Sequence, residues 1–223
     1  MSISNPAPAA TVHLSVGNQE INQLIREGKF LISGGHFNIG RGYHSETWVC
    51  KDSMIADPTV VESLCQPLST RLGLLCENVD AVVGRANGGL VIASQLALQW
   101  SKQSKQPTKC YFAEETDHDG LKFRPSFSKA LEGKRVVVTS VVITTGTTIR
   151  EVANEVRLQG GEVVGAVAWF RRTLTSPSDF GHVPFLLTLD RANLQSWAEG
   201  PCPLCDHGTA LSNEYGIHLP DKF

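Results

Sequence analysis

The stretch from residue 134 to residue 160 constrains the fold more than any other part of the chain. It begins with a run of β-branched residues at 135–139, which is typical of a buried strand. Apolar residues then recur at helical spacing from 149 to 158, and Gly160 is a typical helix terminator. Between them lies the hydroxyl-rich sequence Thr-Thr-Gly-Thr-Thr. The stretch therefore predicts a strand, a tight loop and a helix in direct succession.

This loop is suited to bind a phosphate monoester. The first backbone N–H groups of a helix have no partner within it, and the helix dipole favours an anion there. Four threonine hydroxyl groups add further donors. A threonine N-cap needs no ligand, but this cluster is larger than a cap requires. The predicted phosphate site consists of Thr144, Thr145, Gly146, Thr147 and Thr148.

The sequence Val-Ile-Thr-Thr-Gly at residues 142–146 resembles the signature loop of the type I phosphoribosyltransferases, and within them of the orotate phosphoribosyltransferases. The resemblance implies that the loop holds the 5-phosphate of phosphoribosyl diphosphate. It also implies two acidic residues just before the loop that hold the ribose hydroxyls. Those positions are Ser140 and Val141 in this chain. Ser140 can still hydrogen-bond a hydroxyl, whereas Val141 cannot and carries no charge.

A second loop of similar design follows a predicted buried strand at 79–83 and precedes an apolar helix at 90–100. Its glycines either offer N–H groups to an anion or allow close packing of helix on strand. The resemblance implies the first role, the binding of diphosphate. The implied diphosphate residues are Arg85, Ala86, Asn87 and Gly88.

Alternating strands and helices predict an α/β fold with a doubly wound, mostly parallel sheet and a ligand at its carboxyl edge. Further strands are expected at 109–113, at 163–170 and, as an edge-like strand, at 183–189. A helix is expected at 18–27 and another at 58–72.

We expect a single domain after a disordered N-terminal arm at residues 1–15. Within residues 16–223 the resemblance implies three parts. These are a small N-terminal hood subdomain at about 16–56, a core at about 57–190 and a tail at about 191–223.

The hood stretch at 30–51 has glycines and alternating apolar residues, which predict a hairpin. Its resemblance to the family's hood implies four pocket candidates, each of which could equally be a surface turn or strand end. They are His44, Ser45, Thr47 and Lys51. Lys51 is preferred, because a single cation suits an anionic base. Arg171, after the 163–170 strand, is the second implied base-binding residue, with a surface arginine as the alternative.

Residues 114–124 are a polar stretch that corresponds to the family's mobile catalytic loop. The resemblance implies basic residues over the diphosphate, but Glu114 and Glu115 stand at the start of this stretch. Acidic groups repel a diphosphate unless a cation intervenes. The catalytic candidates that remain are His118, Lys122 and Arg124.

The tail contains Cys202-x-x-Cys205 followed by His207, which can be half of a zinc site. The count of nearby ligands reaches at most three, so we predict no metal site there. The six cysteines are expected to be reduced thiols. Mg²⁺ is the cofactor that the family resemblance implies.

Composition limits the partners. The 223-residue chain has a net charge of −2, so nothing suggests that nucleic acid or an anionic membrane is a partner. No apolar run approaches the ~20 residues of a membrane span, and no secretory signal is apparent. We therefore expect a cytoplasmic protein, and the resemblance implies a homodimer whose partners are phosphoribosyl diphosphate and a pyrimidine base or nucleotide.

Two functions stay open on the sequence. The first is transfer of ribose 5-phosphate from phosphoribosyl diphosphate to orotate or a similar base. The second is a catalytically degenerate homologue that binds a nucleotide or regulates, because both the acidic pair and the basic loop are changed. A changed sugar donor or hydrolysis at the glycosidic bond is a third possibility, but no residue is seen that positions water.

Overall fold

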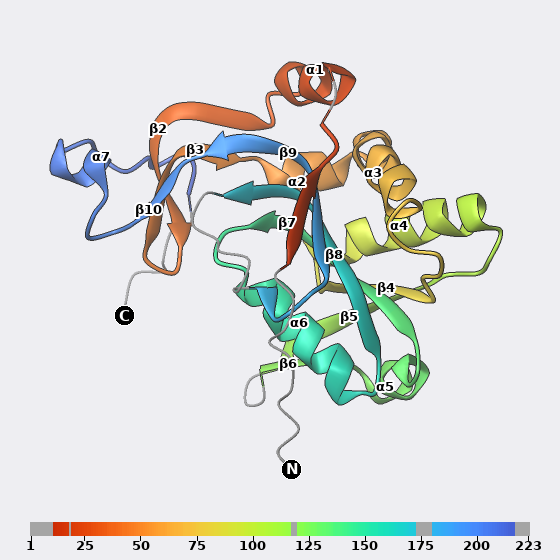
Figure 1. The fold of residues 1–223 in the computed structure, drawn as a ribbon. Helices are drawn as coiled ribbons and strands as arrows, with labels where there is room; N and C mark the ends of the chain where they lie inside the picture. Colours follow the sequence, from red (N-terminus) through yellow and green to blue (C-terminus); the bar gives the residue numbers. More distant parts are fainter. Residues whose placement is uncertain (1–10, 18, 117–119, 173–179, 217–223) are drawn as a thin grey trace, which may run out of the picture.

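The computed structural model describes residues 11–17, 19–116, 120–172 and 180–216, and for residues 190–193 only the backbone (Figure 1). Its centre is a seven-stranded sheet in the order β1-β9-β8-β7-β4-β5-β6. The strands in that order are β1 (Val12–Ser15), β9 (Phe185–Leu194), β8 (Glu162–Arg172), β7 (Arg135–Ile143), β4 (Ala81–Arg85), β5 (Lys109–Thr116) and β6 (Gly120–Lys122). All neighbouring strands are parallel except β5 and β6. The predicted α/β fold with a mostly parallel sheet is confirmed.

Helices cover both faces of this sheet. Helices α3 (Pro58–Leu72) and α4 (Gly88–Ser104) pack on one face, where Val82, Val137 and Trp169 are buried. Helices α5 (Pro125–Leu131) and α6 (Thr147–Leu158) pack on the other. Successive strand residues point to opposite faces, so the β-branched run of β7 supplies both cores at once.

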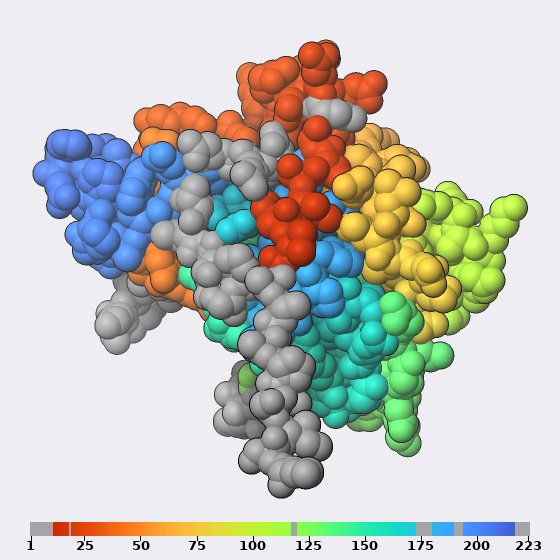
Figure 2. Space-filling view, viewed as in Figure 1, coloured from red at the N-terminus to blue at the C-terminus, as the bar shows by residue number. Residues whose placement is uncertain are grey.

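The hood is a second, three-stranded antiparallel sheet in the order β10-β3-β2. Strands β2 (Leu31–Gly40) and β3 (Tyr43–Val49) form the predicted hairpin, and β10 (Ser196–Ala198) adds a third strand from the tail. Helix α1 (Gln19–Glu27) precedes the hairpin and α2 (Lys51–Ala56) follows it. The short helix α7 (Pro203–Asp206) is the last helix of the described tail, which lies against the hood at one end of the molecule (Figure 2). The sequence did not predict the third strand.

The structure corrects three further expectations. Residues 12–15, expected in a disordered arm, form β1, which pairs with β9 and is anchored where Thr11 Oγ1 donates to the Val183 carbonyl oxygen at 2.7 Å. Because β1 takes the outer position, β9 is an interior strand and the edge-like assignment was wrong. Within the stretch 114–124, expected as a loop, residues 114–116 of β5 instead pair antiparallel with residues 120–122 of β6. Residues 1–10 lie outside the described part.

The tail corrects the count of metal ligands. It brings Cys202 and Cys205 next to two hood histidines, His36 and His44, whereas His207 is not part of this group. The expectation of at most three nearby ligands was therefore wrong. Among the described helices, none is both long and apolar enough to span a bilayer.

Candidate functional site

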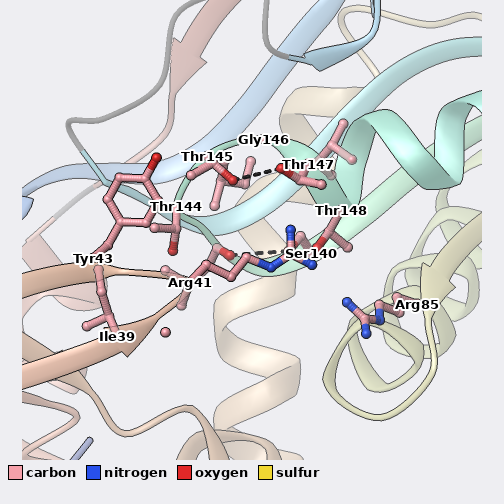
Figure 3. A pocket seen from close by; sticks show the side chains of 14 residues that line it. Ile39, Arg41, Tyr43, Arg85, Ser140, Thr144, Thr145, Gly146, Thr147 and Thr148 are labelled. Carbon is pink, nitrogen blue, oxygen red and sulfur yellow. Dashed lines mark hydrogen bonds between the residues drawn. The ribbon is translucent and has the colours of Figure 1, made fainter. Parts of the chain in front are cut away.

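The predicted phosphate loop lies where β7 ends and α6 begins. Gly146 precedes the first helical residue with φ at +79°, a left-handed conformation that glycine adopts without strain. The Thr145 and Thr147 hydroxyl groups lie 2.9 Å apart, close enough to share a hydrogen bond (Figure 3). Residues 144–148 all line a cavity of about 180 Å³. The structure thus places the five predicted phosphate residues around one space at a helix N-terminus.

A hood cation that the sequence reasoning missed reaches the same cavity. Arg41 lies in the turn between β2 and β3, and its side chain extends from the hood toward Ser140 (Figure 3). Its φ of +55° falls between Gly40 at +88° and Gly42 at +74°. The Gly-Arg-Gly sequence was the available signal, because consecutive left-handed residues make a tight turn that presents the middle side chain.

The diphosphate candidates border a larger, neighbouring cavity of about 450 Å³. The lining of this cavity includes residues 85–89 and Lys51, and it shares Arg85, Ser140 and Thr148 with the smaller one. The two cavities are therefore adjoining parts of one cleft. They lie at the carboxyl ends of β4 and β7, where the strand order reverses direction, which is the usual ligand position in such a sheet.

Two of the glycines in the second loop serve packing. A Cβ added to Gly84 would lie 2.2 Å from the Gly89 carbonyl oxygen, so α4 approaches β4 too closely for any side chain there. Gly88 instead borders the cleft, and Asn87 adopts a φ of +72° just before α4 begins. The packing alternative thus explains Gly84 and Gly89 and leaves residues 85–88 facing the larger cavity.

The two residues of the predicted ribose position, Ser140 and Val141, lie near the carboxyl end of β7. Ser140 and Val141 are 8% and 6% exposed, and both line the larger cavity. Among the described residues that line the cleft, Asp52 is the one carboxylate. Mg²⁺ prefers carboxylate and phosphate oxygens. This donor set does not fit a magnesium ion held by a protein carboxylate pair at the ribose.

Two of the predicted catalytic residues, Lys122 and Arg124, lie outside the lining of the cleft. Arg124 Nε and Nη2 each donate to a Glu114 carboxylate oxygen at 2.7 Å, which holds the pKa of Glu114 below its ordinary value and raises the pKa of Arg124. Lys122 Nζ lies 3.3 Å from a Glu155 oxygen. Neither cation lines the cleft, so the structure does not bring them to the site. His118 lies outside the described residues.

Arg85 does line the cleft, but it forms an ion pair with Glu115. The acidic β5–β6 hairpin therefore competes with a diphosphate for this cation. The sequence predicted that Glu115 would repel a diphosphate, and the ion pair adds that Glu115 also occupies Arg85.

Arg171, the predicted base-binding arginine, does not line the cleft, whereas the next residue does. Arg171 Nη1 donates to His13 Nδ1 at 3.0 Å, its guanidinium lies 5.7 Å from the centre of the Phe180 ring, and it does not line the cleft. Arg172 lines the larger cavity instead. Adjacent strand residues point to opposite faces, so a single step along β8 decides which arginine can face a ligand.

Arg172 is held by the hood. Its Nη1 donates to Ser45 Oγ at 2.8 Å, to the Thr47 carbonyl oxygen at 3.1 Å and to Ser196 Oγ at 3.3 Å. The side chain is buried, and the desolvation lowers the pKa of the guanidinium to about 10. Ser45 and Thr47, predicted to touch the ligand, therefore act on the cleft through Arg172. The predicted His44 lies in the histidine–cysteine group, while Lys51 lines the larger cavity as expected.

The sequence of this chain is similar to those of known orotate phosphoribosyltransferases. The chain is 32% identical over 192 residues to orotate phosphoribosyltransferase from Carboxydothermus hydrogenoformans, covering 86% of this chain and 94% of that protein. It is also 32% identical over 181 residues to orotate phosphoribosyltransferase from Caldanaerobacter subterraneus, covering 81% of this chain and 88% of that protein. The chain belongs to the orotate phosphoribosyltransferase family. The predicted family is therefore confirmed, although no family model matches the chain.

Solved structures of phosphoribosyltransferases share the fold of this family member. Orotate phosphoribosyltransferase from Aeropyrum pernix superposes with a TM-score of 0.57 at 23% identity, over 76% of this chain and 93% of that one. Adenine phosphoribosyltransferase from Trypanosoma brucei, in complex with AMP, pyrophosphate and ribose-5-phosphate, gives a TM-score of 0.57 at 15% identity, over 87% and 91%. At these identities the likeness establishes the fold alone.

Proposed function

We propose that this chain transfers ribose 5-phosphate from phosphoribosyl diphosphate to orotate or a similar base. The observation that carries the proposal is the single cleft in which residues 144–148, residues 85–88 and Lys51 meet. Two helix N-termini, those of α4 and α6, open into this cleft and favour two separate phosphate groups. Phosphoribosyl diphosphate carries anionic groups at both ends of its ribose, which matches this arrangement.

Each part of the cleft has a defined task in that reaction. Residues 144–148 bind the 5-phosphate, and Arg41 covers it from the hood. Residues 85–88 at the start of α4 bind the diphosphate and stabilise the negative charge that grows on it as the bond to ribose C1 breaks. Lys51 and Arg172 provide positive charge for an anionic base on the other side of the larger cavity. Holding both reactants in one cleft favours their direct combination.

A requirement for Mg²⁺ belongs to the same proposal. The ion would enter with the phosphate oxygens of the substrate and water as its ligands, as Mg²⁺ commonly does. The homodimer also belongs to the proposal, since a partner subunit could supply the cations that Lys122 and Arg124 do not bring to the cleft. The predicted cytoplasmic location agrees with six free cysteines.

A second function is favoured by one specific observation, the absence of acidic side chains at positions 140 and 141. Each lost hydrogen bond to a charged group contributes ~1.5–3 kcal/mol. A loss of that size in the transition state slows the reaction about tenfold for each 1.36 kcal/mol. The phosphate loop is untouched by this loss. The second candidate is therefore a protein that binds a nucleotide in the same cleft without turning it over.

Calorimetry followed by an activity assay on one sample separates the two functions. Phosphoribosyl diphosphate with Mg²⁺ and then orotidine 5-monophosphate are titrated, and orotate consumption is measured afterwards. Binding with turnover supports the transferase. Binding of the monophosphate without turnover supports the second function, and absence of binding by both ligands rejects both.

Thr148→Val tests the phosphate loop in the same assay, because it removes a hydroxyl while keeping the branched shape. We expect weaker binding of both ligands. The matched control is Thr70→Val on the exposed side of α3, where the hydroxyl donates only to the Gln66 carbonyl oxygen within its own helix. Equal affinities of the two variants would count against the assignment of the loop.

A further inference from the structure

Four side chains that commonly bind metals converge at the outer end of the hood. His36 comes from β2, His44 from β3, and Cys202 and Cys205 from the tail around α7. Their ligand atoms all lie within 4.8 Å of one another. His36, His44 and Cys202 are buried, with 3%, 4% and 0% exposure, and Cys205 closes the group on the solvent side. The group is separate from the cleft, because none of the four residues lines either cavity.

The distances within this group match a tetrahedral metal site. With zinc bonds of about 2.0–2.1 Å to nitrogen and about 2.3 Å to sulfur, tetrahedral angles imply about 3.3 Å between two nitrogens and about 3.6 Å between nitrogen and sulfur. His36 Nε2 and His44 Nδ1 lie 3.0 Å apart. The two sulfurs of Cys202 and Cys205 lie 3.6 Å and 3.7 Å from His36 Nε2, and Cys205 Sγ lies 3.2 Å from His44 Nδ1.

The hydrogen bonding of His36 directs a lone pair into the group. Its Nδ1 lies 2.7 Å from the carbonyl oxygen of Thr209, which can only accept, so Nδ1 carries the proton. In the neutral ring Nε2 is then the bare nitrogen, and it faces His44 and both sulfurs. A backbone carbonyl that accepts from the other ring nitrogen and so fixes the tautomer is a regular feature of metal-bound histidines.

We propose that His36, His44, Cys202 and Cys205 bind one Zn²⁺ ion in a tetrahedral site. On binding, each thiol releases its proton to solvent and the two thiolates balance the charge of the ion, while both histidines stay neutral. The occupied site is electrically neutral, which suits its burial. Two soft sulfur and two imidazole ligands favour zinc over Mg²⁺ or Ca²⁺. Since all four positions are filled by protein, the site is structural and leaves no position for a substrate.

The zinc ion joins the tail to the hood hairpin. Trp197 of β10 pairs with His44 in β3, the Glu199 N–H donates to the Gly42 carbonyl oxygen at 2.9 Å, and the Ser212 N–H donates to the His36 carbonyl oxygen at 2.8 Å. The turn that carries Arg41 is part of the same hairpin. The metal therefore stabilises the hood in the position from which Arg41 reaches the cleft.

The first test needs no variant. We expect about one zinc per chain in the full-length protein by elemental analysis, after purification without added metal. After removal of that zinc, Co²⁺ should produce the visible bands of tetrahedral coordination and a thiolate-to-metal charge-transfer band. Thiol alkylation read by mass spectrometry should modify Cys202 and Cys205 only after a chelator is added. Substoichiometric zinc together with no tetrahedral Co²⁺ spectrum would overturn the proposal, as would a Cys202–Cys205 disulfide in protein kept under reducing conditions.

Two variants add a matched comparison. Cys205→Ser changes the exposed ligand, so the fold is least disturbed, and it should lose the bound zinc and the charge-transfer band contributed by that sulfur. His207→Ala changes an exposed histidine in the same tail that lies outside the group and should keep one zinc per chain. Full zinc content in Cys205→Ser, or loss of zinc in His207→Ala, would contradict the assigned ligand set. These readouts do not depend on phosphoribosyl transfer, so they distinguish failure of the metal site from failure of the proposed activity.

Discussion

Replacing Val141 by aspartate should raise the rate of phosphoribosyl transfer. Val141 lies on the wall of the larger cavity together with residues 85–88, where the family resemblance implies an acidic residue. Val141→Asp places a carboxylate there with little change in side-chain volume. A ribose hydroxyl can donate to this carboxylate, and the bond strengthens as positive charge develops on the sugar.

The expected rise in kcat/KM for Val141→Asp follows from the surroundings of this side chain. A side-chain carbon of Val141 lies 2.7 Å from the position of a Cβ built on Gly88, the first residue of α4. The new carboxylate would thus lie at a helix N-terminus, where the dipole stabilises an anion by ~0.3–1 kcal/mol or more and offsets part of its desolvation. A hydrogen bond to a charged group contributes ~1.5–3 kcal/mol. At 1.36 kcal/mol per factor of ten, kcat/KM should rise about ten- to a hundredfold.

Initial rates of orotate consumption over a range of phosphoribosyl diphosphate concentrations give kcat/KM and so measure the gain, and thermal unfolding checks that each variant is folded. Val141→Asn is the matched control, because it has the same shape as the aspartate without the charge. We expect it to gain less than about tenfold, since a neutral hydrogen bond contributes only ~0.5–1.5 kcal/mol. The reasoning is refuted if folded Val141→Asp binds phosphoribosyl diphosphate but reacts no faster than wild type, or if Val141→Asn gains equally.

Three further predictions concern the cations around the cleft. Arg41→Ala should weaken binding of orotidine 5-monophosphate about ten- to a hundredfold in calorimetry, because one charge-assisted contact of ~1.5–3 kcal/mol to the 5-phosphate is lost. Glu115→Gln should tighten diphosphate binding by up to about fivefold, since an exposed ion pair of ~0–1 kcal/mol no longer occupies Arg85. Arg172→Met should lower the free energy of unfolding by roughly 2–4 kcal/mol in denaturant titration, because the buried acceptors around Ser45 lose their donor.

Each of these predictions has a matched control. Arg26→Ala in the last turn of α1 removes a cation away from the cleft and should leave monophosphate affinity unchanged. Glu114→Gln removes the neighbouring acid whose partner is Arg124 and should change diphosphate affinity less than Glu115→Gln. For the stability prediction, Arg171→Met should destabilise less, because Arg171 is only half-buried. Equal effects of variant and control would contradict the corresponding argument.

The strand, loop and helix at residues 135–158 were predictable because the signal is local. A buried strand, a small-residue loop and a helix start follow one another there, and adjacent residues suffice to form the cavity wall. The parallel sheet was predictable for a similar reason, since each strand carries its own β-branched pattern. Only the ends moved: β7 continues to Ile143 and α6 begins at Thr147, within the usual uncertainty of element boundaries.

Features that depend on distant pairing could not be read from the sequence. The third hood strand pairs residues that are about 150 positions apart, and the histidine–cysteine group joins residues separated by 161 positions. Four residues such as Val12–Ser15 are too few to show strand periodicity. Whether Arg171 or Arg172 lines the cleft depends on which face of the sheet each side chain points to. Alignment with a family motif does not fix that to within one residue.

The completion of the hood by the tail has a consequence for synthesis on the ribosome. Strands β4 to β8 pair with one another, so their pairing partners are synthesised close together in time. The β2–β3 hairpin gains its third strand and the two cysteines only when residues 196–205 have been synthesised. Strand β1 likewise waits for β9. We expect a nascent chain that has emerged through β8 to hold a partly folded core and an open hood. A protein truncated before residue 196 should therefore form the loops at residues 85–88 and 144–148, but its hood would lack β10 and the two tail cysteines.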